Sequence, residues 1–418
     1  SFAFITADLQ ASREYSTSAE RSRRATKVQQ QISISSIHKL IKMNPLAPLV
    51  FFFGKDMFRY IIMFSGVSIV ASFLTQNGIL WGEYFLWITL IAIATIIIWR
   101  AGDFFSQAAT YIQEKHEIPQ SIKAAVIDAI ASSFPEFCVA VIAVIIIGRA
   151  EVGISSIIGS ALYNVLIIPA AAGLVAATPM VISREVVWRD NIFYLGVVLL
   201  LGAMLWYFPN EWGAGVAVTF LLAYLAYVFL LHRDFKISKI QNTDPPKNEV
   251  TMSENGEDGE LELTSTKIAW LWILAMMIVM GGASHLLVEA SLALGEMLGI
   301  DGVIMGFVVI AAGTSVPDTA LSVISARKGQ YDAAISNVFG SNIFDICVCL
   351  SIPILLALAM SGEPTSFDLP QIELIWSLAG VTVLAIYLFW SNNYTLTKVK
   401  ASMMGLLYLI IILISFTF

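Results

Sequence analysis

The stretch VIAAGTSVPDTALS, from Val309 to Ser322, places a Thr, a Ser, a Pro and an Asp within five positions of an apolar run long enough to cross a bilayer. An ionised Asp at the centre of a membrane helix costs at least about 2.5 kcal/mol on insertion scales. A Pro inside a helix also removes a backbone hydrogen bond. A cluster of this kind therefore needs a partner, a cavity or an ion.

The composition of the chain predicts a polytopic, multi-pass integral membrane protein. The 418 residues are 57% hydrophobic and only 13% charged, whereas an ordinary soluble domain is about 25% charged. We expect the lipid bilayer and inorganic cations as partners, with no nucleic acid and no obligate protein partner. The composition does not indicate which membrane the protein occupies.

The cysteines predict neither a disulfide framework nor a thiolate metal site. Their number is odd, and Cys138, Cys347 and Cys349 all lie within apolar segments. We expect them to be small buried packing residues.

Eleven apolar segments approach the roughly 20 helical residues that cross a bilayer core of about 30 Å. A polar and increasingly acidic segment separates the sixth from the seventh and is typical of a flexible loop. Lys and Arg are concentrated in alternate loops, which predicts that those loops, including this one, are cytoplasmic. The apolar segments lie near residues 57–75, 80–112, 120–148, 153–177, 192–208, 213–231, 268–298, 302–326, 332–360, 371–391 and 401–418.

This organisation predicts an all-α fold with a ten-helix core made of two inverted five-helix repeats, plus an extra N-terminal span. The predicted parts are a polar basic tail at 1–56, the extra span at 57–75, the first repeat at 80–231, a cytoplasmic acidic loop at 232–266 and the second repeat at 267–418.

The repeat is visible because the opening motif occurs twice. Ser132 to Glu136 (SSFPE) matches Thr314 to Asp318 (TSVPD) at an offset of 182 residues. A second pair, Gly159 to Asn164 (GSALYN) and Gly340 to Asp345 (GSNIFD), follows at an offset of 181. Each half contains five spans, so the second half enters the membrane in the opposite sense. Inverted repeats of this kind predict a substrate site near the midplane, where the halves meet.

Helix geometry gathers polar side chains on one face in each half, because residues three and four positions apart are neighbours on a helix. Pro135 and Pro317 each free a carbonyl group one turn earlier. Together these groups predict a cage of hard oxygen atoms. Its side chains come from Ser132, Ser133, Glu136, Ser156, Ser160, Asn164, Thr314, Ser315, Asp318, Asn337, Ser341 and Asp345.

Carboxylates, hydroxyls, an amide and carbonyls suit Ca²⁺ or Na⁺, and the absence of His and Cys from the cluster argues against zinc and copper. Glu136, Asp318 and Asp345 carry three negative charges when ionised. Three Na⁺, or Ca²⁺ with one monovalent cation, or in part protons would balance them, which is a physical basis for exchange. The alternative is that the hydroxyls join helices and the acids cap them, but the duplication of the whole constellation argues against it.

At these residues the sequence resembles the calcium/cation antiporter superfamily of sodium/calcium exchangers, over about residues 80–418. GTSVPD with GSNIFD is most similar to the potassium-dependent branch. The resemblance implies that the helices near 80–112 and 268–298 slide across a fixed core. It implies Glu136 and Asp318 as principal Ca²⁺ ligands, and further ligands among Ser133, Ser160, Asn164, Thr314, Ser315, Ser341 and Asp345. We add Ser132, which shares their face.

The resemblance implies no cofactor and a transported set of Ca²⁺, Na⁺ and, as an open option, K⁺. Asp345 stands where the potassium-dependent branch keeps an acid, although some potassium-independent relatives keep one too. The proton-coupled branch carries a different acidic motif in place of GTSVPD, which favours Na⁺. A proton-coupled exchanger, or one for Mg²⁺, remains the alternative.

Two positions depart from the family pattern. Ala131-Ser132 replaces the usual Gly-Thr, and Asp128 stands where an apolar residue is usual. Asp128 lies two turns from Glu136, about 12 Å along the axis at 1.5 Å per residue, which is too far to share one ion. We expect a role on the pathway that approaches the site, or a carboxylate satisfied by water or a neighbouring helix.

Two functions of other classes are less compatible with the sequence. A passive cation channel does not require an inverted repeat, which favours alternating access. An intramembrane aspartyl protease needs two acids in a Gly-x-Gly-Asp context that is missing here. The chain is therefore expected to be a secondary transporter and not an enzyme.

Overall fold

The computed structural model divides the chain into two compact units, 1–59 and 60–418. Of the first unit only the beginning of helix α2, Ala47–Gln76, is described, and the second unit contains both repeats. The described residues are 47–76, 80–116, 129–184, 186–240, 261, 263–368 and 373–416.

The first repeat consists of five helical segments in the described residues. Two of them change to π-helix along their length, one near its end and one at its start. In chain order they are α3, Leu80–Lys115; α5, Ala129–Val141, with η2, Ile142–Ile147; α6, Ala150–Val175; η3, Val186–Asp190, with α7, Asn191–Tyr207; and α8, Ala214–Ile240.

The second repeat has the same order of segments. Its second and third segments are each interrupted by π-helix. They are α9, Thr266–Leu298; α10, Gly302–Met305, with η5, Gly306–Ile310, and α11, Ala311–Arg327; α12, Tyr331–Phe344, with η6, Asp345–Cys349, and α13, Ser351–Ser361; α14, Glu373–Tyr394; and α15, Lys398–Ser415.

The helices differ from the predicted spans in length. Among the described residues, nine helices are long and apolar enough to cross a membrane, and two of the eleven predicted spans correspond to the shorter apolar helices Tyr60–Gln76 and Ser132–Ile147. Helix α8 continues to Ile240, beyond the predicted end at 231, because the sequence from 232 to 240 contains no Gly or Pro to stop it.

Helix ends follow from local capping chemistry. The side chain of Ser265 accepts a hydrogen bond from the Ile268 amide at the start of α9, and Asp301 caps α10 in the same way. Gly299 ends α9 with a φ of 68°, a left-handed conformation that costs glycine little. These caps satisfy backbone groups that the ends of α9 and α10 would otherwise leave without a partner.

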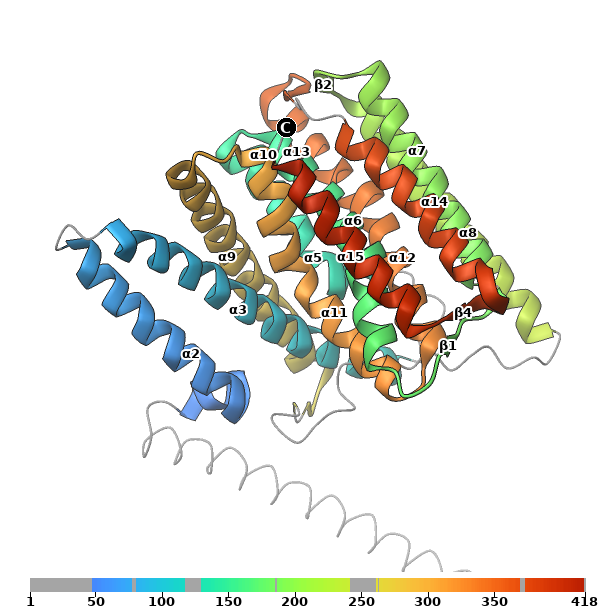
Figure 1. Cartoon of the computed structure of the whole chain (residues 1–418), viewed down its shortest axis with the longest axis horizontal. Helices are drawn as coiled ribbons and strands as arrows, with labels where there is room; N and C mark the ends of the chain where they lie inside the picture. Colours follow the sequence, from blue (N-terminus) through green and yellow to red (C-terminus); the bar gives the residue numbers. More distant parts are fainter. Residues whose placement is uncertain are drawn as a thin grey trace, which may run out of the picture. The chain divides into compact units, whose positions relative to one another are not determined.

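Two short antiparallel sheets reveal the symmetry of the repeats. Strand β1, Met180–Val181, pairs with β4, Thr395–Leu396, while β2, Glu211–Trp212, pairs with β3, Thr365–Ser366. β1 and β3 follow the third segment of their repeats, and β2 and β4 follow the fourth. Exchanging the two repeats therefore converts one sheet into the other. The labels β2 and β1 with β4 lie at opposite ends of the helices in Figure 1, as an inverted repeat requires.

Helices α3 and α9, the first of each repeat, pack along each other (Figure 1). Helix α6 packs against α11 and α15. In the most apolar window of α6, 78% of the residues are buried, against 22% in α15. This difference places α6 in the protein interior, and the apolar exposed surface of α15 is suited to lipid.

Gly159 permits a close approach of the two repeats. A Cβ atom at this position would overlap the carbonyl group of Phe307 in η5. Its repeat mate, Gly340, has only the Tyr227 hydroxyl at 3.8 Å. Glycine is therefore required by close packing in the first repeat and not in the second.

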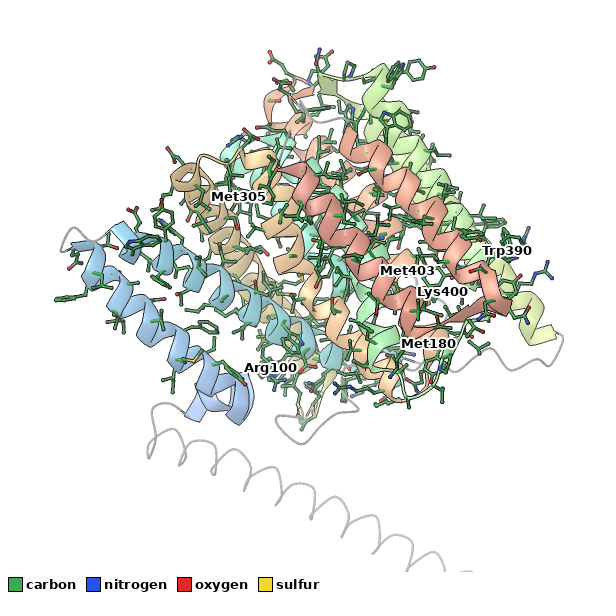
Figure 2. All side chains as sticks on the ribbon, in the orientation of Figure 1. Arg100, Met180, Met305, Trp390, Lys400 and Met403 are labelled. Carbon is green, nitrogen blue, oxygen red and sulfur yellow. The ribbon has the colours of Figure 1, made fainter. Side chains whose placement is uncertain are left out.

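Helix α14 ends in an unusual turn. Asn392, Asn393 and Tyr394 all have positive φ, 58°, 52° and 58°, a region that non-glycine residues rarely occupy. The ammonium group of Lys400 donates to three carbonyl oxygens in and beside this turn, those of Leu388 at 2.7 Å, Ser391 at 2.8 Å and Thr395 at 2.9 Å. Figure 2 shows Lys400 near Trp390 and Met180 at this end of the helices.

Candidate cation-binding site

The polar motifs lie on four helical segments, two from each repeat. The SSFPE motif is in α5 and the TSVPD motif in α11, and both remain helical through their prolines. The GSALYN and GSNIFD motifs lie in α6 and in α12 with the start of η6. These four segments surround the position where the repeats meet.

All of the predicted ligands are buried. Ser132 is the most accessible of them, with 6% of its surface exposed. Burying polar groups of this kind is costly unless each finds a partner. The buried predicted ligands are Ser132, Ser133, Glu136, Ser160, Asn164, Thr314, Ser315, Asp318, Ser341 and Asp345.

A chain of hydroxyl contacts joins the repeats at Glu136. The Ser160 hydroxyl donates to the Glu136 carboxylate at 3.4 Å. It also shares a hydrogen bond of 2.8 Å with the hydroxyl of Ser315 in the other repeat. The Thr314 side chain lies beside Glu136 as well. Helices α6 and α11 therefore both contribute hydroxyls to the carboxylate of α5.

The three carboxylates form one electrostatic group. The Glu136 carboxylate is close enough to Asp318 and Asp345 for their charges to interact, and Asp318 acts on Asp345 in the same way. Asp345 lies beside Ser133 of the first repeat. Like charges gathered in a buried place repel one another unless protons or cations compensate them.

An amide bridge, Asn164 to Asn342, forms a second link between the repeats. The Asn164 amide donates to the Asn342 side-chain oxygen at 2.9 Å, and the Asn342 amide donates to the Ala161 carbonyl at 3.2 Å. Asn342 is not part of a matched polar pair, because its repeat mate is the apolar Ala161, and the sequence therefore did not predict its role. The sequence signal for Asn342 was an amide side chain inside a predicted membrane span, directly after Ser341.

Five buried oxygen atoms of the predicted ligands have no hydrogen-bond donor in the described part of the chain. Both repeats contribute, and all five are hard oxygen donors of the kind that Ca²⁺ and Na⁺ prefer. Buried acceptors of native proteins normally have partners, so a cation fits this set. The atoms are Ser133 Oγ, Glu136 Oε2, Asn164 Oδ1, Asp318 Oδ1 and Asp345 Oδ2.

Carboxylates alone do not complete a cation site here. Within the described residues, no three His, Cys, Asp or Glu side chains are grouped around one metal position. A cation held by these atoms would take its other ligands from hydroxyl, amide and carbonyl oxygens. This agrees with the mixed oxygen cage predicted from the sequence.

The structure connects the remaining predicted residues less directly to the carboxylates. The Ser341 hydroxyl donates to the Val338 carbonyl of its own helix at 3.2 Å. Asn337 is half-buried, and Asp128 lies outside the described residues. The π-helix η6 begins at Asp345, so the regular helical spacing that the sequence argument assumed ends there. π-Helical turns are rare and frequently occur at functional sites.

An inverted pair of five-helix repeats around a buried cluster of carboxylates defines a secondary transporter of the membrane. The chain belongs to the sodium/calcium exchanger protein family, whose model matches residues 86–232 and 268–417. The two matched segments follow the two repeats and omit the polar loop between them. The protein is accordingly a multi-pass cation/Ca²⁺ exchanger and not an enzyme.

Individual relatives agree with the family. The chain is 28% identical over 268 residues to the inner membrane protein YrbG of Escherichia coli, a match that covers 64% of this chain and 79% of YrbG. It is 26% identical over 396 residues to the human sodium/potassium/calcium exchanger 5, covering 74% and 77% of the two chains.

Solved structures share the fold. The H⁺/Ca²⁺ exchanger CAX superposes with a TM-score of 0.59 at 14% identity, over 86% of this chain and 89% of CAX. The sodium-calcium exchanger NCX_Mj gives a TM-score of 0.52 at 18% identity, over 78% and 97%. These similarities confirm the helical membrane fold predicted from the sequence.

Proposed function

We propose that the chain exchanges Ca²⁺ for Na⁺ by alternating access, with K⁺ accompanying Ca²⁺. The name of the human relative, a sodium/potassium/calcium exchanger, supports this choice of ions. The TSVPD and GSNIFD motifs support it as well, since they are most similar to the potassium-dependent branch.

One observation carries the proposal, namely the five unpartnered buried oxygens, three of which belong to the mutually interacting carboxylates. Three ionised carboxylates carry a charge of −3, which Ca²⁺ with one monovalent cation, or three Na⁺, neutralises. Charges left uncompensated in a buried place are strongly unfavourable. A protein that must hold one neutralising set or the other can release one only when it takes up the other, and this coupling produces exchange.

The proposal gives different residues different roles. Glu136 and Asp318, on the repeat-related helices α5 and α11, are the principal ligands of Ca²⁺. Ser160 of α6 connects the Glu136 carboxylate to Ser315 of α11. Asp345, whose repeat mate is the neutral Asn164, binds the monovalent cation. Sliding of α3 and α9 across the core would expose the cations to each side in turn.

The test is Ca²⁺ uptake into proteoliposomes under separate outward gradients of Na⁺, of Na⁺ with K⁺, and of protons. We expect Na⁺ to drive uptake, and K⁺ to increase it when present on the side of Ca²⁺. Glu136→Gln and Asp318→Asn should each abolish uptake, because a divalent ion would be left underneutralised. Asp301→Asn is the matched control: it also removes one acid, but Asn is an equally good helix cap.

Each arm of the experiment has an outcome that contradicts part of the proposal. Uptake driven by protons alone would identify a proton-coupled exchanger. Flux that needs no counter-ion would identify a channel, and preference for Mg²⁺ over Ca²⁺ would change the substrate. Normal uptake by a folded Asp318→Asn protein would refute the assigned ligand. Asp345→Asn should reduce the dependence on K⁺ without eliminating exchange.

A further inference from the structure

Cys349 has surroundings that its apolar sequence context did not predict. The thiol is fully buried in η6 and lies 3.7 Å from Asp345 Oδ1 and 3.7 Å from the Ser133 carbonyl oxygen. Its repeat mate at the offset of 181 is the apolar Ile168. Cys138 of the first repeat also lies near Glu136, but Cys349 is the cysteine whose sulfur contacts the Asp345 carboxylate.

Two atoms beside this thiol are unpartnered. In the described part of the chain, Asp345 Oδ2 and the Ser133 hydroxyl have no hydrogen-bond partner in good geometry, although the two residues are 1% and 0% exposed and their side chains lie beside each other. A thiol has a single weak proton to donate, and here that proton faces two acceptors. The sulfur thus lies in a group of oxygen atoms that its own hydrogen bond does not satisfy.

We propose that Cys349, Asp345 and Ser133 form a binding site for a thiophilic divalent cation close to Ca²⁺ in size, of which Cd²⁺ is the type. The ligands are the Cys349 sulfur, the Asp345 carboxylate and the Ser133 backbone carbonyl. This inference rests on the proposed function only in the route by which the cation enters.

Charge and ligand softness both support this assignment. Coordination replaces the S–H bond with a sulfur–metal bond, and the thiol proton is released to solvent. The thiolate and the Asp345 carboxylate then carry two negative charges, which one divalent cation neutralises. Thiolate ligands select soft metal ions, whereas Ca²⁺ takes oxygen ligands. Cys349 therefore favours Cd²⁺ over Ca²⁺ at this side of the cluster.

The first experiment measures binding without transport. Purified protein in detergent is titrated with Cd²⁺, and the sulfur-to-cadmium charge-transfer absorption is recorded. We expect one equivalent to saturate the signal in the parent protein and the signal to be lost in Cys349→Ser. Cys347→Ser is the matched control, because Cys347 is equally buried in η6 but faces another direction, two positions away. Cys349→Ala replaces the serine variant if the latter does not fold.

The second experiment measures inhibition of Ca²⁺ uptake by Cd²⁺ in proteoliposomes, normalised to the uptake of each variant without Cd²⁺. We expect the half-inhibitory concentration to rise at least about tenfold in Cys349→Ser, the lower end of what even outer ligands contribute to metal affinity. The Cys347→Ser protein should be inhibited by Cd²⁺ at the same concentration as the parent protein.

The outcomes separate this inference from the proposed function. If no Ca²⁺ uptake occurs in any protein but the absorption signal depends on Cys349, the exchange proposal fails and the cadmium site stands. If uptake occurs but Cys349→Ser retains both the signal and the parental inhibition, the thiol only donates a hydrogen bond to Asp345 and the inference is wrong. A signal lost instead in Cys138→Ser would also overturn it.

Discussion

At the residue scale, the repeats are joined within the site by side chains that no local pattern pairs. The Ser160–Ser315 hydrogen bond and the Asn164–Asn342 bridge each join one residue from each half. The first contact includes the Ser160 hydroxyl that donates to the Glu136 carboxylate, so the geometry of this charged group depends on it. Asn342 is the hardest of these residues to replace, because its side-chain oxygen accepts one hydrogen bond and its side-chain nitrogen donates another.

Replacing Asn342 with Ala should reduce both stability and transport. The Asn164 amide would lose its partner in a buried place, which costs about 1–3 kcal/mol, and the Ala161 carbonyl would keep only the donor of its own helix. Thermal unfolding in detergent and Ca²⁺ uptake measure the two effects. Asn337→Ala, in the same helix but half-buried, is the control for unfolding. Equal unfolding temperatures for the two variants would show that the bridge contributes nothing.

At the element scale, two backbone features hold the helices in place. Gly159 lets α6 approach η5 of the other repeat, and Lys400 satisfies carbonyls at the end of α14. The first feature operates in the centre of the protein and the second at one end of the helices. Both can be tested against a matched position within the same chain.

Gly159→Ala should destabilise the protein, because the added methyl group would overlap the Phe307 carbonyl. Overpacking of this kind costs about 1–3 kcal/mol. At the repeat mate, Gly340→Ala should be neutral or stabilising by up to about 1 kcal/mol, since alanine is the better helix former. The unfolding temperatures of the two variants give the comparison, and equal changes in both would contradict the close contact.

Lys400→Met should loosen the turn after α14. Three carbonyls would lose an ammonium donor, and the cation that opposes the negative end of the helix dipole would be gone. We expect a loss of about 1–3 kcal/mol and faster proteolysis between residues 391 and 395. Lys398→Met removes an exposed cation from the same helix start and should change neither. A Lys400→Met protein as resistant as this control would refute the role of the cap.

At the scale of the whole molecule, the two small sheets relate the halves. The β1–β4 sheet and the β2–β3 sheet are equivalent under exchange of the repeats, so they must lie on opposite sides of the membrane. The basic residues Arg184 and Arg189, just after β1, predict that the β1–β4 side is cytoplasmic.

Single cysteines on the two sheets should react from opposite sides. Val181 in β1 is 61% exposed, and Ser366 in β3 is also exposed. Val181→Cys should be labelled by a membrane-impermeant maleimide only from the cytoplasmic side, and Ser366→Cys only from the other. Background labelling should be small because the three native cysteines are buried. Labelling of both positions from one side would exclude the inverted arrangement.

The sequence by itself determined the order of the helices, their inverted duplication and the set of buried polar side chains. These properties follow from hydropathy, helical spacing and internal similarity, which are written along the chain. Near-constant offsets of 181 and 182 residues were enough to pair Glu136 with Asp318 and Asn164 with Asp345. The predicted roles of these residues as ligands stay a prediction.

Only the tertiary structure decided which of these groups touch. The Asn342 bridge and the strand pairings join residues that are distant in sequence, and the Lys400 cap joins the ends of two helices. The contact of Cys349 with Asp345 depends on the π-helical register of η6. Hydropathy predicted only burial for Cys349, because an apolar context does not reveal what lies across a helix interface. Contacts of this kind depend on how the two repeats pack, and no local stretch of sequence contains that information.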